Sequence, residues 1–101
     1  MEQGNKLYIA SLGHGMGATG HSGHTLLSVD ATNYKKLTIN SGFYTVYAGD
    51  EYLKISDQTG NLYYSQSGGV SNLVIDISNS TKVSIDLFTT NNAMLSGISF
   101  E

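Results

Sequence analysis

The chain has 101 residues, enough for one domain with its own hydrophobic core, which we place at 1–101. It contains no cysteine, proline or tryptophan, so a disulfide framework and a cysteine-ligated zinc site are excluded. Charged residues make up 13% of the chain and the net charge is −3, which argues against nucleic-acid binding. No run approaches the roughly 20 apolar residues of a membrane span, and the first residues do not form a signal peptide. We therefore expect no membrane insertion.

Apolar and polar residues alternate with a period of two along most of the chain, which predicts strands rather than helices. Polar and glycine-containing turns separate the alternating segments, and Gly60 can supply the positive φ of a tight hairpin turn. In chain order, the predicted strands cover 6–11, 24–31, 36–40, 43–48, 52–56, 62–65, 73–78, 82–87 and 94–100. Eight to nine short strands predict an all-β fold, a single antiparallel β-sandwich that is jelly-roll-like.

The same alternation predicts the core. A one-residue slip would expose the whole inward set, so that set is well specified. We expect the following residues to be buried: Leu27, Val29, Leu37, Ile39, Leu53, Ile55, Leu73, Ile75, Ile77, Val83, Ile85 and Ile98.

An internal echo links two parts of the chain. The segment Asp30 to Ile39 reappears 46 residues later as Asp76 to Ile85, with four of ten positions identical. Each copy consists of an alternating segment, a polar turn with asparagine, and a second alternating segment. We expect two related hairpins in similar positions of the sandwich, related by a pseudo-twofold axis and with turns of equal length.

The segment 12–24 departs from this pattern and predicts a long Gly/His-rich loop. It contains GxGxxG at 15–20, but the dinucleotide motif needs a helix and a parallel βαβ unit after it, and a strand pattern follows here. It also contains all three histidines, His14, His21 and His24. Imidazole is a common metal ligand, so these residues are a candidate divalent-metal site. The alternative is three solvent-exposed histidines and no cofactor.

Seven tyrosines suggest a binding surface, because flat aromatic faces stack on sugar rings while polar side chains bond the hydroxyls. The alternative is that tyrosine simply suits half-buried strand positions. Three tyrosines fall on the polar side of their predicted strands, and three polar residues lie near them. The candidate ligand-binding set is Tyr44, Tyr52, Tyr63, Asn61, Asp50 and Gln66.

Catalytic patterns are not recognisable in the sequence. Asp50 and Glu51 are adjacent, so their side chains diverge in a strand and do not form a glycosidase pair. Asp30 and Asp76 end equivalent segments and are expected to accept backbone hydrogen bonds across their turns. We therefore expect a protein that is not an enzyme.

Several segments resemble a known type of module. VDATNYKKLTI, VIDISNSTKVSIDL and the ending MLSGISFE look like the strands of small jelly-roll carbohydrate-binding modules and of sandwich domains in phage tail and baseplate proteins. The resemblance covers roughly 26–101 and leaves out the Gly/His-rich loop. It implies receptor binding at a virion or extracellular surface.

The leading expectation is a non-catalytic module that recognises a glycan or another host-surface receptor, as part of a phage virion or a surface adhesin. The alternative is a structural virion or filament subunit that acts through protein–protein contacts. Shallow sugar sites bind weakly and gain avidity when they are linked, so we also expect a homo-oligomer, with a trimer as the first candidate.

Overall fold

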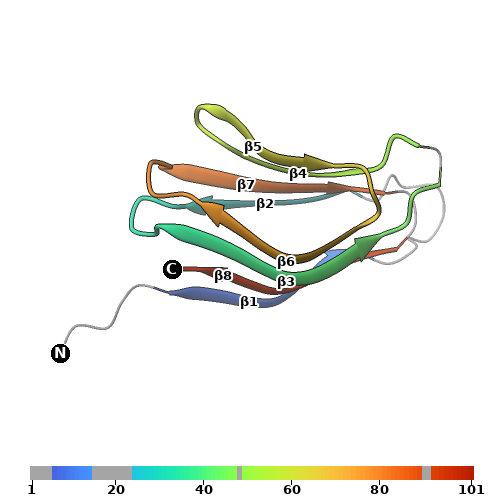
Figure 1. Ribbon diagram of the computed structural model, residues 1–101, viewed down its shortest axis with the longest axis horizontal. Helices are drawn as coiled ribbons and strands as arrows, with labels where there is room; N and C mark the ends of the chain where they lie inside the picture. The colour runs from blue at the N-terminus through green and yellow to red at the C-terminus, as the bar shows by residue number, and fades with distance from the viewer. Residues whose placement is uncertain (1–5, 15–23, 48, 90–91) are drawn as a thin grey trace.

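The computed structural model describes residues 6–47, except 15–23, together with 49–89 and 92–101. Within these residues all regular structure is β-strand, arranged as two packed four-stranded antiparallel sheets (Figure 1). In spatial order, sheet A contains β1 (Leu7–His14), β8 (Ala93–Phe100), β3 (Lys36–Tyr44) and β6 (Gly69–Asp76). Sheet B contains β2 (His24–Asp30), β7 (Lys82–Phe88), β4 (Tyr52–Asp57) and β5 (Gly60–Ser65). The described residues include no helix that could cross a membrane.

This strand order confirms the predicted jelly-roll sandwich. Consecutive strands alternate between the two sheets, except for β4 and β5, which form a hairpin. The first and last strands pair with each other inside sheet A. The largest errors in the predicted strand bounds are all in sheet A. β6 begins at Gly69, four residues before the predicted start at 73. β1 continues to His14, so Leu12 to His14 belong to a strand and not to the predicted loop. β3 is one strand where the sequence predicted two separated by a turn at Ser41 and Gly42.

The core lies between the sheets. Eight of the twelve predicted core residues are fully buried, and the other four are half-buried. Those four, Leu27, Val29, Leu73 and Ile75, lie on β2 and β6, the strands at the sheet edges, where only one neighbouring strand covers them. Among the described residues, the buried apolar side chains are Ala31, Leu37, Ile39, Tyr44, Leu53, Ile55, Ile77, Val83, Ile85, Leu87, Ala93, Leu95, Ile98 and Phe100.

A crease crosses sheet A from edge to edge. One row of residues interrupts the cross-strand pairing, and the register is the same on both sides of it. This row contains Ala10, Gly97, Asn40 and Asn72. Gly97 and Asn72 have positive φ values of 67° and 51°, and Asn72 is the only non-glycine with positive φ among the described residues. A Cβ on Gly97 would lie 2.7 Å from the Cβ of Asn40, so only glycine fits this point of the crease.

The crease changes which positions face the core. On β3, Ile39 is buried on one side of the row and Tyr44 on the other. They are five residues apart, whereas regular alternation separates inward-facing residues by an even number. On β8, Leu95 and Ile98 are both buried, three residues apart. Strict alternation places Tyr44 on the outer face, and that prediction is wrong because Asn40 and Ser41 both face outward.

The echoed segments are not hairpins. Each joins two strands of different sheets: 31–35 connects β2 to β3, and 77–81 connects β6 to β7. We call these two five-residue connections the arches. Their equal length agrees with the prediction, and both begin with a residue that is fully buried, Ala31 in one and Ile77 in the other.

Hydrogen bonds relate the two arches by a pseudo-twofold axis. The N–H of Ala31 donates to the carbonyl of Thr81 (3.0 Å), and the N–H of Ile77 donates to the carbonyl of Lys35 (2.9 Å). Exchanging the two halves, by adding 46 to the donor's number and subtracting 46 from the acceptor's, converts the first bond into the second. The strand order shows the same relation. If β1, β2, β3 and β4 are exchanged with β5, β6, β7 and β8, the strand order of one sheet becomes that of the other.

Candidate functional site

The outer face of sheet B carries a cluster of aromatic and polar side chains, which we call the aromatic face. It contains Tyr52, Tyr64, Phe88, His24, Lys54 and Asp86. Cross-strand pairing brings them together: His24 lies opposite Phe88, Phe88 opposite Tyr52, and Lys54 opposite both Asp86 and Tyr64. All four strands of sheet B therefore contribute to one surface.

The rings form a connected layer. Tyr52 and Tyr64 are stacked, with centroids 5.7 Å apart and planes inclined by 27°. Phe88 lies 5.7 Å from Tyr52 on its other side, and the edge of His24 meets Phe88 at 6.0 Å. Tyr64 is 50% exposed, so its ring remains available to a ligand. Mutual contact between aromatic rings favours these offset and edge-on arrangements and holds the layer in place.

Asp86 organises the polar groups of the face. Its Oδ2 accepts a hydrogen bond from the Tyr52 hydroxyl (3.2 Å), and its Oδ1 is hydrogen-bonded to Nε2 of His24. Partial burial and the Asp86 charge together raise the pKa of the Tyr52 hydroxyl, which therefore stays protonated and donates. The ammonium group of Lys54 lies 5.8 Å from the centre of the Tyr52 ring. A cation, a carboxylate and an imidazole thus border the rings.

The predicted binding residues separate into three groups. Tyr52 lies on the aromatic face. Tyr44 is buried, and its hydroxyl donates to the carbonyl of Ser65 (2.7 Å), so its place in the predicted set was wrong. Tyr63 packs half-buried against the core, on the other side of β5 from Tyr64, because neighbouring strand residues point to opposite faces. The predicted tyrosine patch therefore does not exist as a unit.

The three predicted polar residues are exposed, and their pairing places them near the ends of sheet B. Asn61 pairs with Ser56 beside the β4–β5 turn. Asp50 precedes β4, and Gln66 follows β5, where its Nε2 donates to the carbonyl of Gly49 (3.3 Å). Asp50 and Glu51 diverge as predicted, since Asp50 is exposed and Glu51 is fully buried with its Oε1 accepting from the N–H of Gly49 (2.9 Å).

Tyr64, Phe88 and Asp86 were missed by the sequence analysis. Alternation around Ile85 and Leu87 does place Asp86 and Phe88 on the outer face, so their orientation could have been predicted. Their proximity to Tyr52 and Tyr64 could not, because it depends on β7 pairing with β4 across 34 residues of sequence.

The candidate metal site cannot be assembled from the described residues. His21 and the side chain of His14 lie outside them, and His24 is bound to Asp86 on the aromatic face. No group of three potential metal-ligating side chains occurs in the part of the chain that the structure describes.

The chain matches no family model, no curated protein and no solved structure in the comparisons made with each. The chemistry of the site therefore rests on its geometry. His24 and Asp86 form a base-and-orienter pair, but the Ser28–Ser84 hydroxyl pair (3.2 Å) lies four residues along β2 from His24, about 13 Å away. This separation prevents these serines from acting as a nucleophile for His24.

Proposed function

We propose that the protein is a non-catalytic glycan-binding module and that the aromatic face is its binding surface. The observation that carries this proposal is the layer formed by Tyr52, Tyr64 and Phe88 on the outer face of sheet B, in which Tyr64 is exposed and the other two rings are half-buried, and which polar groups border. Soluble proteins rarely leave such rings on a surface without a partner.

Sugar chemistry fits this combination. The C–H-rich face of a pyranose ring packs on the exposed part of Tyr64 and gains hydrophobic and dispersion energy there. Asp86 accepts hydrogen bonds from sugar hydroxyls, while Lys54 and His24 supply donors. One carboxylate and one ammonium leave the face without a strong net charge, which suits a neutral polyhydroxylated ligand better than a polyanion.

A glycan array tests the proposal. We expect the wild-type protein to be retained by a limited group of glycans, and Tyr64→Ala to reduce that retention at least tenfold. Tyr8→Ala is the matched control, because Tyr8 is a strand tyrosine of similar exposure (60%) on the outer face of the other sheet. Absence of retention by any glycan, or equal loss in both variants, would refute the proposal.

Sheet A supports a second candidate function, a subunit of a homo-oligomeric assembly. Its only charged strand residues are Lys36 and Asp76, which pair at one end of the sheet. The rest of the sheet is uncharged, with exposed apolar side chains at Tyr8, Phe43, Val74 and Met94. Depletion of charge is typical of the centre of protein interfaces. Light scattering tests this candidate: Phe43→Ser should lower the mass of an oligomer, and a monomeric wild-type protein at high concentration would exclude it.

A further inference from the structure

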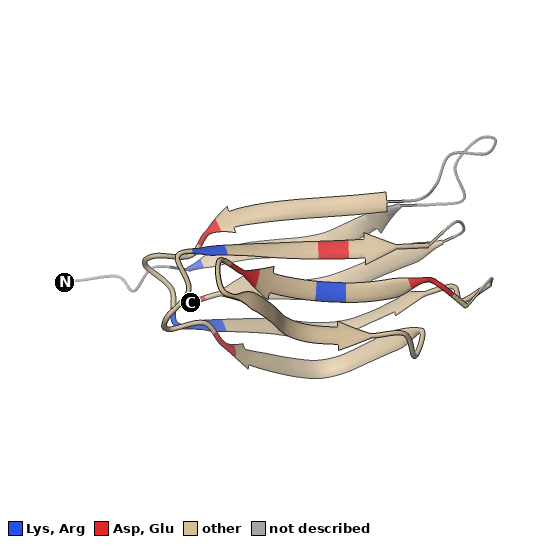
Figure 2. Ribbon diagram, turned by 90° about the horizontal axis from the view of Figure 1, so that it is seen from above, with Lys and Arg blue, Asp and Glu red and all other residues tan. Residues whose placement is uncertain are grey.

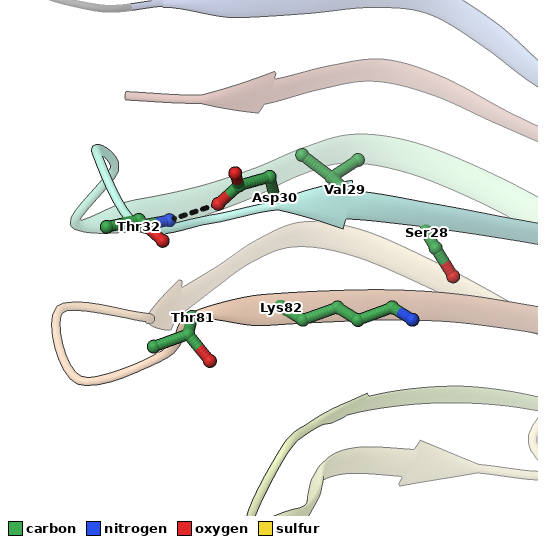
Figure 3. A pocket seen from close by; sticks show the side chains of 6 residues that line it. All are labelled: Ser28, Val29, Asp30, Thr32, Thr81 and Lys82. Atoms are coloured by element: carbon green, nitrogen blue, oxygen red, sulfur yellow. Dashed lines mark hydrogen bonds between the residues drawn. The ribbon is translucent and has the colours of Figure 1, made fainter.

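A polar depression of about 400 Å³ lies at the arch end of sheet B. Its lining comes from β2, from β7 and from both arches: Ser28, Val29, Asp30, Thr32, Thr81 and Lys82 (Figure 3). Asp30 lies opposite Lys82 in the β2–β7 pairing, and the backbone bond between Ala31 and Thr81 joins the two arches at its floor. We call this feature the arch depression. It belongs to the same strands as the aromatic face but contains no aromatic ring.

The groups in the arch depression can both donate and accept hydrogen bonds. The N–H of Thr32 donates to Oδ1 of Asp30 (3.1 Å), and this bond lowers the pKa of the Asp30 carboxyl, which is ionised at neutral pH. Its other oxygen remains an acceptor. Figure 3 shows the Lys82 side chain extended along β7 with its ammonium end on the side of Ser28. Neighbouring sugar hydroxyls can therefore donate to Asp30 and accept from Lys82.

Charge distribution separates this region from the rest of the surface. Charged residues of both signs gather at the arch end of the sandwich (Figure 2), among them the Asp30–Lys82 and Lys36–Asp76 pairs. An anionic ligand would meet Asp30, and a cationic ligand would meet Lys82, so neither gains a clear advantage. A neutral ligand with vicinal hydroxyls satisfies both groups.

The depression and the aromatic face lie in line. Lys82 and Phe88 are six residues apart on the single strand β7, a separation of about 20 Å. The Ser28 and Ser84 hydroxyls occupy the interval on the same outer face. An interval of this length exceeds a mono- or disaccharide and matches a short, extended oligosaccharide.

We propose that the arch depression is a second sugar subsite, which holds one ring of an extended β-linked hexose chain whose other end stacks on the aromatic face. This inference rests on the proposed function and deepens it, since it assigns the length and linkage class of the glycan. Extended β-1,4-linked hexose chains are straight ribbons whose ring substituents are mostly equatorial, and they can run across the outer face of sheet B from the arch depression to the aromatic face. A chain bound at both ends gains affinity over a fragment that reaches only one of them.

The test uses three soluble probes, cellohexaose, chitohexaose and β-1,4-mannohexaose, titrated into ¹⁵N-labelled protein. We expect at least one to shift the backbone amides of Ser28, Thr32 and Lys82 together with those of Tyr52 and Tyr64. The corresponding disaccharide should bind at least tenfold more weakly. Asp30→Asn, which keeps the acceptor for the Thr32 N–H, and Lys82→Met should each weaken hexasaccharide binding at least tenfold and leave disaccharide binding within twofold.

The pseudo-twofold axis provides matched controls. Asp76→Asn and Lys36→Met change the equivalent pair on sheet A, in the same arch environment, and should leave binding unchanged. Shifts confined to the aromatic face would overturn the second subsite while leaving the proposed function intact. Shifts confined to the arch depression would overturn the proposal that one glycan chain spans both features, and with it the role of the aromatic face in binding. No shift with any of the three hexasaccharides would overturn this inference, and the glycan array would then decide the proposed function by itself.

Discussion

Gly97→Ala should be among the most damaging single-methyl changes in this protein. Gly97 has a φ of 67°, a left-handed conformation that costs an alanine about 1–2 kcal/mol. The added Cβ would also lie 2.7 Å from the Cβ of Asn40, and relieving that overlap requires two paired strands to separate, at about 1–3 kcal/mol. The sum is about 2–5 kcal/mol, a large share of the roughly 5–15 kcal/mol that stabilises a domain of this size.

Urea unfolding followed by far-UV circular dichroism and tyrosine fluorescence measures this loss. Gly49→Ala is the matched control, because Gly49 also has positive φ (94°) but no atom within 4 Å of an added Cβ, so it reports backbone strain alone. In an Asn40→Gly background, Gly97→Ala should recover about 1–3 kcal/mol of its cost, since the overlapping atom is gone. Equal losses at Gly97 and Gly49, with no recovery, would show that the strands at the crease are not in close contact.

Three further predictions concern stability. Tyr44→Phe removes the hydroxyl that donates to a backbone carbonyl from a buried position and should cost about 0.5–1.5 kcal/mol in urea unfolding. Ile85→Ala, at a fully buried position, should cost about 2–5 kcal/mol, and Ile75→Ala should cost clearly less because Ile75 is half-buried on an edge strand. Hydrogen bonds from Ser80 and then Thr59 lower the pKa of Asp57 to about 2. Ionised Asp57 therefore stabilises the folded state above its unfolded pKa of about 4, and this contribution is lost as the pH falls from 4 to 2. Thermal melts of the wild type should show this loss of stability, and melts of Asp57→Asn should lack it.

The fold was largely predictable from local patterns. Period-two alternation identified the strands of sheet B almost to their ends, and the asparagine-containing turns identified both arches. Alternation specifies the inward face of a strand wherever the strand is regular. It could not specify that the arches join different sheets, because a five-residue turn is compatible with a hairpin as well as with a connection between sheets.

The crease explains the largest error. Tyr44 was assigned to the binding surface because the sequence predicted a turn at Ser41 and Gly42 and a separate strand from residue 43, with Tyr44 on its polar side, whereas residues 36–44 form one strand. The crease contains a left-handed residue on β8 and another on β6, and Gly97 lies too close to Asn40 for any larger side chain. These are interactions between strands, so the sequence of β3 alone contains no evidence of the change.

The aromatic face was less predictable than the core for a related reason. A core position requires only that its own strand present an apolar residue inward, whereas the aromatic face requires the correct strand neighbours. Tyr52 was identified because alternation within its own strand places this tyrosine on the polar face. Phe88 and Asp86 become part of this face only because β7 pairs with both β2 and β4.

The pseudo-twofold relation also explains why the aromatic face occurs on sheet B. The residue 46 positions before Asp86 is Asn40, so the centre of the aromatic face and the crease occupy equivalent places in the two halves. On β7 the alternation continues without interruption, with Ile85 and Leu87 buried and Asp86 and Phe88 outward. The irregularity between β4 and β5 begins only at Ser56, beyond the Lys54–Tyr64 pair. Sheet B therefore keeps neighbouring outward side chains on one continuous surface, whereas the crease divides the outer surface of sheet A. A straight glycan that stacks on several rings requires the uninterrupted face, and this requirement favours sheet B as the binding surface.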